Sequence, residues 1–228
     1  MIPAGAPPRV RERLRGAPDG PVPVVHRGPD AVYVDVAGRC VGVVTPRATA
    51  VPCALRTRLP RLDVTAVRLA GGVLHLDDVP VVVGRVVDVR VPRLHLAAPG
   101  GPGGPGAEPA PPGEVAAMVG RGDGLTPYED DVLCGWLAVH RAAGVPTPTV
   151  DAAVAACLDR TTLLSATLLE CAARGEVVPE FAAWLRAVGT PAESAAARRL
   201  AALGHTSGAG MLHGARLALS ALPLKGAA

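Results

Sequence analysis

The chain has 228 residues, of which 49% are hydrophobic, and its 23 basic residues nearly balance its 20 acidic residues to give a formal net charge of +3. This apolar content is enough for a buried core in one large domain or two small ones. The basic residues are interspersed and only 2% of the residues are aromatic, which excludes the clustered charge and stacking platforms of a nucleic-acid-binding protein.

The cysteines and the N-terminal residues bear on the cellular compartment. The five cysteines are odd in number and none is arranged as C-x-x-C, so neither a disulfide framework nor a zinc site is indicated. Residues 1–20 lack the apolar run of a signal peptide, and no apolar stretch has the length of a membrane-spanning helix. We therefore expect a cytoplasmic protein without a membrane partner.

The first half of the chain has the composition of β-strands. Residues 1–21 are rich in Pro, Gly and Arg, and we expect an N-terminal arm there, in which PRVRERLRG forms one or two helical turns. Residues 22–97 contain short β-branched runs such as AVYVDV and CVGVV, separated by turn residues, with Asp77 and Asp78 in a turn after a strand. This pattern predicts an antiparallel β-rich domain, either a sheet or a small barrel.

The second half has the composition of helices. Gly, Pro and Ala dominate residues 98–113, which predicts a linker or a long exposed loop. Residues 114–228 contain alanine-rich segments bounded by Gly, Pro, Thr or Ser, which predicts a bundle of closely packed helices. The expected fold class is therefore α+β, with an N-terminal β-rich half followed by a C-terminal α-helical bundle.

The first stretch with distinctive chemistry is GRGDGLTPYEDD, residues 120–131. Its glycines, among them Gly122 and Gly124, permit positive φ angles and close approach of the backbone to a ligand. Thr126 and Pro127 suit the N-cap and the first position of a helix. A loop of free amides at a helix start favours a phosphate or a carboxylate, so the stretch predicts an anion site.

Three consecutive carboxylates, Glu129, Asp130 and Asp131, fall in the first turn of the same helix. In one interpretation they only stabilise the helix dipole. In the other they belong to the site, and a metal ion, an arginine or an amine of the substrate lies between them and the anion, which they would otherwise repel. Asp130 and Asp131 point about 100° apart on a helix, so in a packed bundle we do not expect both of them to face solvent.

The second stretch is TTLLS, residues 161–165. Thr162 and Ser165 lie on nearly the same face of a helix, and with Arg160 they would offer donors to a carboxylate or phosphate. In the alternative interpretation Thr161 or Thr162 only caps the helix and Ser165 packs against a neighbouring helix. Both interpretations stay open at this point.

The third stretch is GHTSG, residues 204–208. Gly204 ends one helix, and Ser207 and Gly208 begin the next, where glycines favour close packing or the approach of a ligand. His205 is a candidate base or anion contact. A single histidine near a helix start is more often a structural hydrogen-bonding group, which is the alternative.

In this order, the three stretches resemble the motifs of a bacterial family that includes the AllH-type third subunit of oxamate carbamoyltransferase. The family pattern is G-x-G-x-G-L-T-P-S-G-D-D-x-L-x-G, then T-T-x-x-S, then G-H-x-S-G, and the resemblance spans roughly residues 115–220. It implies a carbamoyl transfer between oxamate and phosphate, in allantoin breakdown, by an enzyme with partner subunits. The chain departs from the pattern at Tyr128 and Glu129, where the family has Ser and Gly, so we expect a narrower and more acidic loop.

We therefore expect a cytoplasmic enzyme, or enzyme subunit, of nitrogen metabolism that acts on a small anionic or amide-bearing metabolite. The rival hypothesis is a non-catalytic partner or regulatory subunit whose motifs are structural. We expect either partner subunits or a homo-oligomer and no nucleic acid; no cofactor is required, a divalent cation is compatible with the acidic pair, and no metal ligand is assigned. The candidate catalytic residues are Asp130, Asp131 and His205, and the candidate substrate-binding residues are Gly122, Gly124, Thr126, Arg160, Thr162, Ser165, Ser207 and Gly208.

Overall fold

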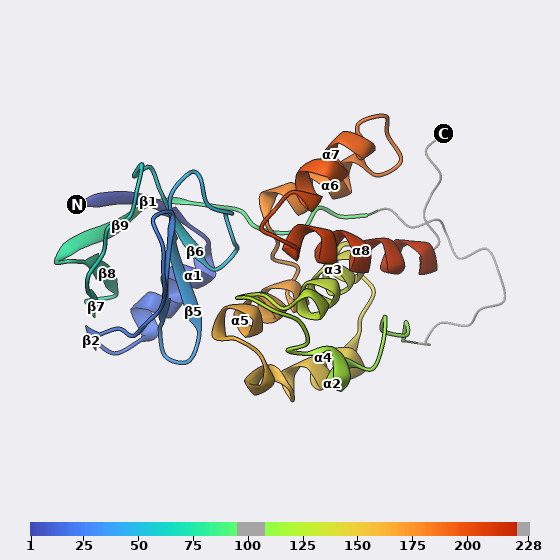
Figure 1. The fold of residues 1–228 in the computed structure, drawn as a ribbon, viewed down its shortest axis with the longest axis horizontal. Helices are drawn as coiled ribbons and strands as arrows, with labels where there is room; N and C mark the ends of the chain where they lie inside the picture. The colour runs from blue at the N-terminus through green and yellow to red at the C-terminus, as the bar shows by residue number, and fades with distance from the viewer. Residues whose placement is uncertain (95–107, 223–228) are drawn as a thin grey trace. The chain divides into compact units, whose positions relative to one another are not determined.

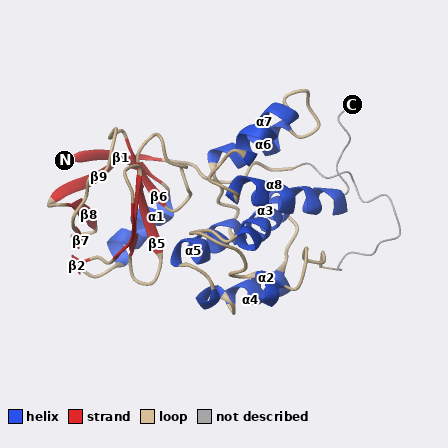
Figure 2. Cartoon of the chain, in the orientation of Figure 1, coloured by secondary structure: helices blue, strands red, loops and turns tan. Residues whose placement is uncertain are grey.

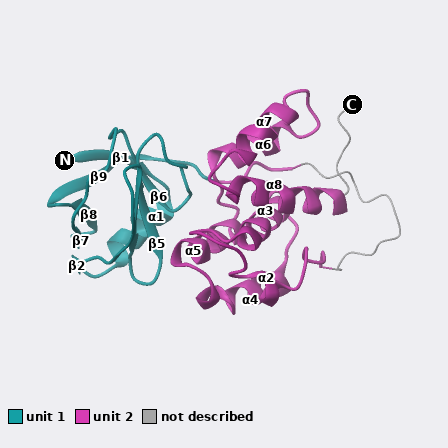
Figure 3. Cartoon of the chain, viewed as in Figure 1, with its two compact units in different colours: residues 1–89 teal, residues 90–228 magenta. Residues whose placement is uncertain are grey.

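The computed structural model of the chain describes residues 1–94 and 108–222 (Figure 1). The chain divides into two compact units, Met1–Val89 and Arg90–Ala228 (Figure 3). The named strands lie in the first unit, and the helices, apart from α1, lie in the second (Figure 2). The predicted fold class, a β-rich half followed by a helical half, is confirmed.

The first unit is built on one curled sheet with the strand order β2-β7-β8-β9-β1-β6-β5-β4-β3. The pairs β1–β9 and β5–β6 are parallel and the other described pairs are antiparallel, so the sheet is mixed. The strands are β1 (Ile2–Ala6), β2 (Gly20–Pro21), β3 (Val24–Arg27), β4 (Ala31–Asp35), β5 (Cys40–Val44), β6 (Ala54–Thr57), β7 (Val67–Ala70), β8 (Val73–Leu76) and β9 (Val79–Val86).

Residues with positive φ angles form two consecutive hairpin turns of this sheet. Gly71 and Gly72, with φ of 56° and 73°, join β7 to β8. Asp77 and Asp78, with φ of 44° and 66°, join β8 to β9. A pair of positive φ angles is typical of two-residue hairpin loops, where Gly, Asn and Asp are the preferred residues. The turn predicted at Asp77 and Asp78 is confirmed.

Residues 1–21, for which the sequence predicted an arm, contribute to the packed unit. β1 lies between β9 and β6 in the sheet, and helix α1 (Pro8–Gly16) buries Val10 and Leu14 in the core. The remaining core is formed by branched aliphatic side chains of the strands, which include Val32, Val34, Val43, Leu55, Leu69, Leu74 and Val81.

The predicted domain boundaries at residues 21, 97 and 113 stay predictions. Val91 donates its backbone N–H to the carbonyl of Gly175 at 2.7 Å, a contact within the second unit. The linker predicted for residues 98–113 falls largely on residues 95–107, which lie outside the described part of the chain.

Helix α3 is the central element of the second unit. Most of its side chains are buried, from Asp130 through His140, as expected of a helix surrounded by others.

None of the helices in the described residues is long and apolar enough to cross a membrane. The helices are α2 (Val115–Met118), α3 (Tyr128–Ala143), α4 (Pro148–Ala155), the 3₁₀ helix η1 (Leu158–Arg160), α5 (Leu163–Ala173), α6 (Pro179–Ala187), α7 (Glu193–Ala201) and α8 (Ser207–Ala221).

Glycines allow α3 and α8 to approach closely, side by side as Figure 1 shows. A Cβ atom at Gly135 of α3 would lie 2.0 Å from the carbonyl oxygen of Met211, and one at Gly214 of α8 would lie 1.8 Å from that of Val132. Along the interface Gly210 lies near Asp131 and Gly214 near Val132, so the two helices run in the same direction. Their N-terminal ends therefore lie together, and this placement creates the candidate site.

Candidate functional site

The loop before α3 requires its glycines. Gly120, Gly122 and Gly124 have φ angles of 82°, 122° and 88°, which residues with a side chain rarely adopt. A Cβ atom at Gly120 would also lie 2.2 Å from the carbonyl oxygen of Arg160, whereas one at Gly124 would meet nothing within 4 Å. The loop is thus fixed by the backbone at Gly120 and faces open space at Gly124.

The start of α3 differs from the prediction. Pro127, and not Thr126, is the N-cap residue, and no side chain caps the helix. The Thr126 hydroxyl oxygen instead lies 2.7 Å from the hydroxyl oxygen of Ser207, the first residue of α8. The expected cap was wrong because a tertiary hydrogen bond takes the Thr126 side chain away from the helix end. This bond joins the first motif to the third.

Asp130 joins the first motif to the second. Its side chain is fully buried and accepts three hydrogen bonds, from the backbone N–H of Gly120 at 2.8 Å, the hydroxyl of Thr161 at 2.5 Å and the hydroxyl of Ser165 at 2.6 Å. Thr162 accepts the backbone N–H of Ser165 at 3.1 Å as the N-cap of α5. Thr162 is therefore a cap and Ser165 holds Asp130 in place, and the substrate-binding roles of both residues stay predictions.

Asp131 has a different environment from Asp130, although the two are adjacent. It is 3% exposed, and its Oδ2 atom has no hydrogen-bond partner among the described residues. Burial raises the pKa of Asp131 from 3.8 to about 7, and the negative charge of Asp130 adds to this effect. The Ser207 and Thr126 hydroxyl groups lie close enough to lower this pKa in part. Asp131 is thus a buried acceptor with unused capacity.

The backbone around Asp131 is rich in unused donors. The amides of residues 122–126 make no hydrogen bond to any other described residue. The first turns of α3 and α8 also carry the partial positive charge of a helix N-terminus. We define the N-terminal cluster as loop 122–126, Asp131 and Ser207. It combines amides, two hydroxyl groups and one buried carboxyl group.

Three other predicted residues, Arg160, His205 and Gly208, make no side-chain hydrogen bond to this cluster in the described part of the chain. Arg160 is exposed, and its Nη1 atom lies 3.8 Å from Sγ of Cys157. His205 is exposed in the turn before α8. Gly208 packs α8 against α7, because a Cβ there would lie 1.8 Å from the carbonyl oxygen of Leu200. The roles assigned to Arg160 and His205 stay predictions.

The sequence analysis missed one pair beside the cluster. The Tyr128 hydroxyl group lies 3.1 Å from Nδ1 of His213 on α8. His213 follows Gly210 by three positions, so it lies on nearly the same helix face, and this spacing was the available signal. Tyr128, the departure from the family pattern, thus contacts α8 through its side chain.

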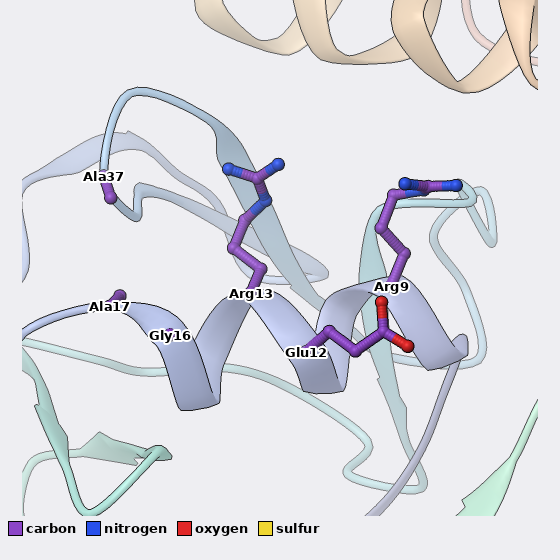
Figure 4. Close-up of a pocket in the computed structure, with 6 residues that line it drawn as sticks. All are labelled: Arg9, Glu12, Arg13, Gly16, Ala17 and Ala37. Carbon is purple, nitrogen blue, oxygen red and sulfur yellow. The ribbon is translucent and has the colours of Figure 1, made fainter.

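Two hollows elsewhere do not form comparable sites. One of about 330 Å³ lies on α1, where Arg9 and Arg13 point to the same side (Figure 4), but it is wide open and both arginines already interact within the chain. Another of about 360 Å³ adjoins Arg141, which already binds Asp151 and Thr147. In the described residues no group of three His, Cys, Asp or Glu side chains is placed to hold a metal ion.

The part of the chain that carries the three motifs matches a known family model. Residues 118–219 match the AllH family. Its description is oxamate carbamoyltransferase subunit AllH, and the match covers the helical unit from the end of α2 to most of α8. It confirms the resemblance that the motifs predicted. Comparison with curated proteins and with solved structures finds no matching relative.

Proposed function

We propose that the chain is a subunit of a carbamoyltransferase-type enzyme and that its helical unit binds a small anionic, amide-bearing metabolite at the N-terminal cluster. The observation that carries the proposal is the buried, unpartnered Oδ2 atom of Asp131 beside two helix N-termini. Buried polar atoms without a partner are rare in proteins, and a bound ligand is one way to satisfy them. The AllH match supports the choice of metabolite class.

The anionic end of the metabolite binds the amides of residues 122–126 and the start of α8 in this proposal. Helix N-termini attract carboxylates through both unpaired N–H groups and the helix dipole. The same unit provides a precedent, since the Glu108 carboxylate accepts the backbone N–H groups of Thr149 and Val150 at the start of α4, at 3.0 and 3.1 Å. One of the Thr126 and Ser207 hydroxyl groups donates to the other, so the pair offers at most one further O–H donor to the anion.

Arg160 and His205 complete the proposed site at its border. Both side chains are exposed. The Arg160 carbonyl lies against Gly120, two positions before the loop of the cluster, and His205 precedes Ser207 of the cluster by two positions. We propose that Arg160 neutralises the bound anion and that His205 contacts it or transfers a proton. Because AllH is described as a subunit, we also propose partner subunits that supply further groups.

A non-catalytic partner subunit is the second candidate function, and one observation favours it. Asp130, Ser165 and Thr162, three residues of the motifs, make hydrogen bonds within the chain that hold the helices together. In that case Asp131 would only line the contact between α3 and α8. The two functions differ in whether the cluster binds a small molecule.

Titration calorimetry on the purified chain separates the two functions. We expect wild type to bind oxamate, the compound in the family description, and Asp131→Asn to bind it at least about tenfold more weakly, because a charge-assisted hydrogen bond is lost. Asp159→Asn is the matched control, since Asp159 is exposed in the same unit and loses the same charge. No heat with oxamate, carbamoyl phosphate or phosphate would favour the partner function.

A further inference from the structure

The two adjacent carboxylates of the first motif have separate tasks. Asp130 is occupied by three donors of the protein itself, from the loop and from the segment that begins α5. Asp131 is turned about 100° away from Asp130 around the helix axis. It lies against Gly210 of α8, because a Cβ atom built at Gly210 would lie 2.9 Å from the Cβ atom of Asp131. Only Asp131 therefore keeps a free acceptor.

The surroundings of Asp131 restrict what its free oxygen accepts. A metal ion is disfavoured, because in the described residues no group of three His, Cys, Asp or Glu side chains is placed to bind one. An ammonium group is disfavoured as well, since two helix N-termini place positive partial charge beside Asp131. A neutral N–H donor satisfies the oxygen without adding positive charge.

The same surroundings restrict the rest of the ligand. The amides of residues 122–126 bind no other described residue and offer donors to an anion. The hydroxyl groups of Thr126 and Ser207 lie 2.7 Å apart and near the Asp131 carboxyl group, so they stand between these two parts of the cluster. A ligand that fills the cluster therefore carries an N–H group close to an anionic group.

We infer that Asp131 is the specificity-determining residue of the site, and that its Oδ2 atom accepts an N–H of a carboxamide group so that an amide-bearing anion is selected over a plain anion. The inference rests on the proposed function, because it assigns a role within the same site. The proposed site differs from a general anion site, in which the Asp131 carboxylate would only weaken the binding of the anion. A buried acceptor rejects a ligand that leaves it unpaired.

Oxamate and oxalate form a matched pair for the test, since oxalate has a second carboxylate where oxamate has its amide. We would measure the dissociation constants of both compounds on the full chain by titration calorimetry at pH 8. Wild type should bind oxamate at least about tenfold more tightly than oxalate, which places a second negative charge against Asp131. This comparison within wild type needs no variant.

The variant Asp131→Asn then tests the residue. Its amide donates to oxalate as well as accepting from oxamate, so the preference for oxamate should fall to within about threefold. Asp159→Asn should keep the wild-type preference, and far-ultraviolet circular dichroism should show that both variants are folded. If wild type binds both compounds equally, or Asp131→Asn keeps the preference, the inference is overturned while the site stands. If wild type binds neither compound, the proposed function fails and the inference falls with it.

Discussion

The side-chain oxygens of Thr126 and Ser207 lie 2.7 Å apart, although 81 positions separate the two residues in the chain. This hydrogen bond links the glycine-rich loop to the first residue of α8. Asp130 links the same loop to Thr161 and Ser165. The three motifs therefore meet at the start of α3, and the site depends on contacts that hold the two helix N-termini together.

The stability of the helical unit is measurable by itself. The chain has two tryptophans, Trp136 and Trp184, and both are buried in this unit. Urea unfolding followed by tryptophan fluorescence therefore reports on the helical unit and not on the β-rich one.

The bond between Thr126 and Ser207 should be detectable by a double-mutant cycle. Thr126→Val and Ser207→Ala should each lower the free energy of unfolding by about 1 kcal/mol, the usual contribution of such a hydrogen bond. The double variant should lose little more than either single one, because both changes remove the same bond. Fully additive losses would contradict the contact.

Asp130→Asn should destabilise the helical unit strongly. The change replaces a charged acceptor of three hydrogen bonds with an amide that cannot accept all of them, in a fully buried position. We expect a loss of about 3 kcal/mol or more in urea unfolding. Asp159→Asn, at an exposed position, should stay within about 0.5 kcal/mol of wild type, and an equal effect of both changes would rule out the central role of Asp130.

Asp131→Asn should have a stability effect that depends on pH. The pKa of Asp131 is about 7 in the folded chain, above its usual value of 3.8, so the folded state holds a proton that the unfolded state releases. The contribution of Asp131 to the free energy of unfolding therefore falls as pH rises from about 4 to 7, by at most about 4 kcal/mol. Relative to wild type, Asp131→Asn should become more stable over this window.

The measurement for this prediction is urea unfolding of both proteins at pH 5 and pH 8. The difference between variant and wild type should shift in favour of the variant at pH 8. A difference that is the same at both pH values would show that the carboxyl group of Asp131 is not perturbed by burial.

Two glycine-to-alanine changes should differ in effect. Gly214→Ala places a Cβ atom 1.8 Å from the carbonyl oxygen of Val132, so α3 and α8 must separate, and we expect a loss of about 3 kcal/mol or more. The Cβ atom of Gly124→Ala meets no atom within 4 Å, so only the positive φ angle of this residue lowers the free energy of unfolding, by about 1–2 kcal/mol. Similar losses for both would argue against the close contact of the two helices.

Features of the fold that depend on local sequence were predictable. The hairpin turn at Asp77 and Asp78 and the cap at Thr162 follow from what these residue types do next to their own backbone. The order of strands first and helices second follows from β-branched runs and alanine-rich segments. β1 was not predicted, because IPAGA lacks the residues typical of a strand and is held by pairing with distant β6 and β9.

The arrangement inside the site required the structure. The sequence placed Asp130 and Asp131 together in one acidic group, and nothing local distinguishes them. Their tasks differ because Asp130 faces hydroxyl groups 31 and 35 positions away, whereas Asp131 faces α8. The role of Thr126 was also not predictable from local sequence, because a hydrogen bond to Ser207, 81 positions away, replaces the helix cap that a threonine usually forms.

The most direct test of the account is a nuclear magnetic resonance titration of the ¹⁵N-labelled chain with oxamate. The account predicts that the largest amide shift changes fall on loop residues 122–126 and on the first turns of α3 and α8. It also predicts that Asp131→Asn weakens these changes and that Asp159→Asn does not. Shift changes confined to other parts of the chain, or none at saturating oxamate, would contradict a small-molecule site at the N-terminal cluster.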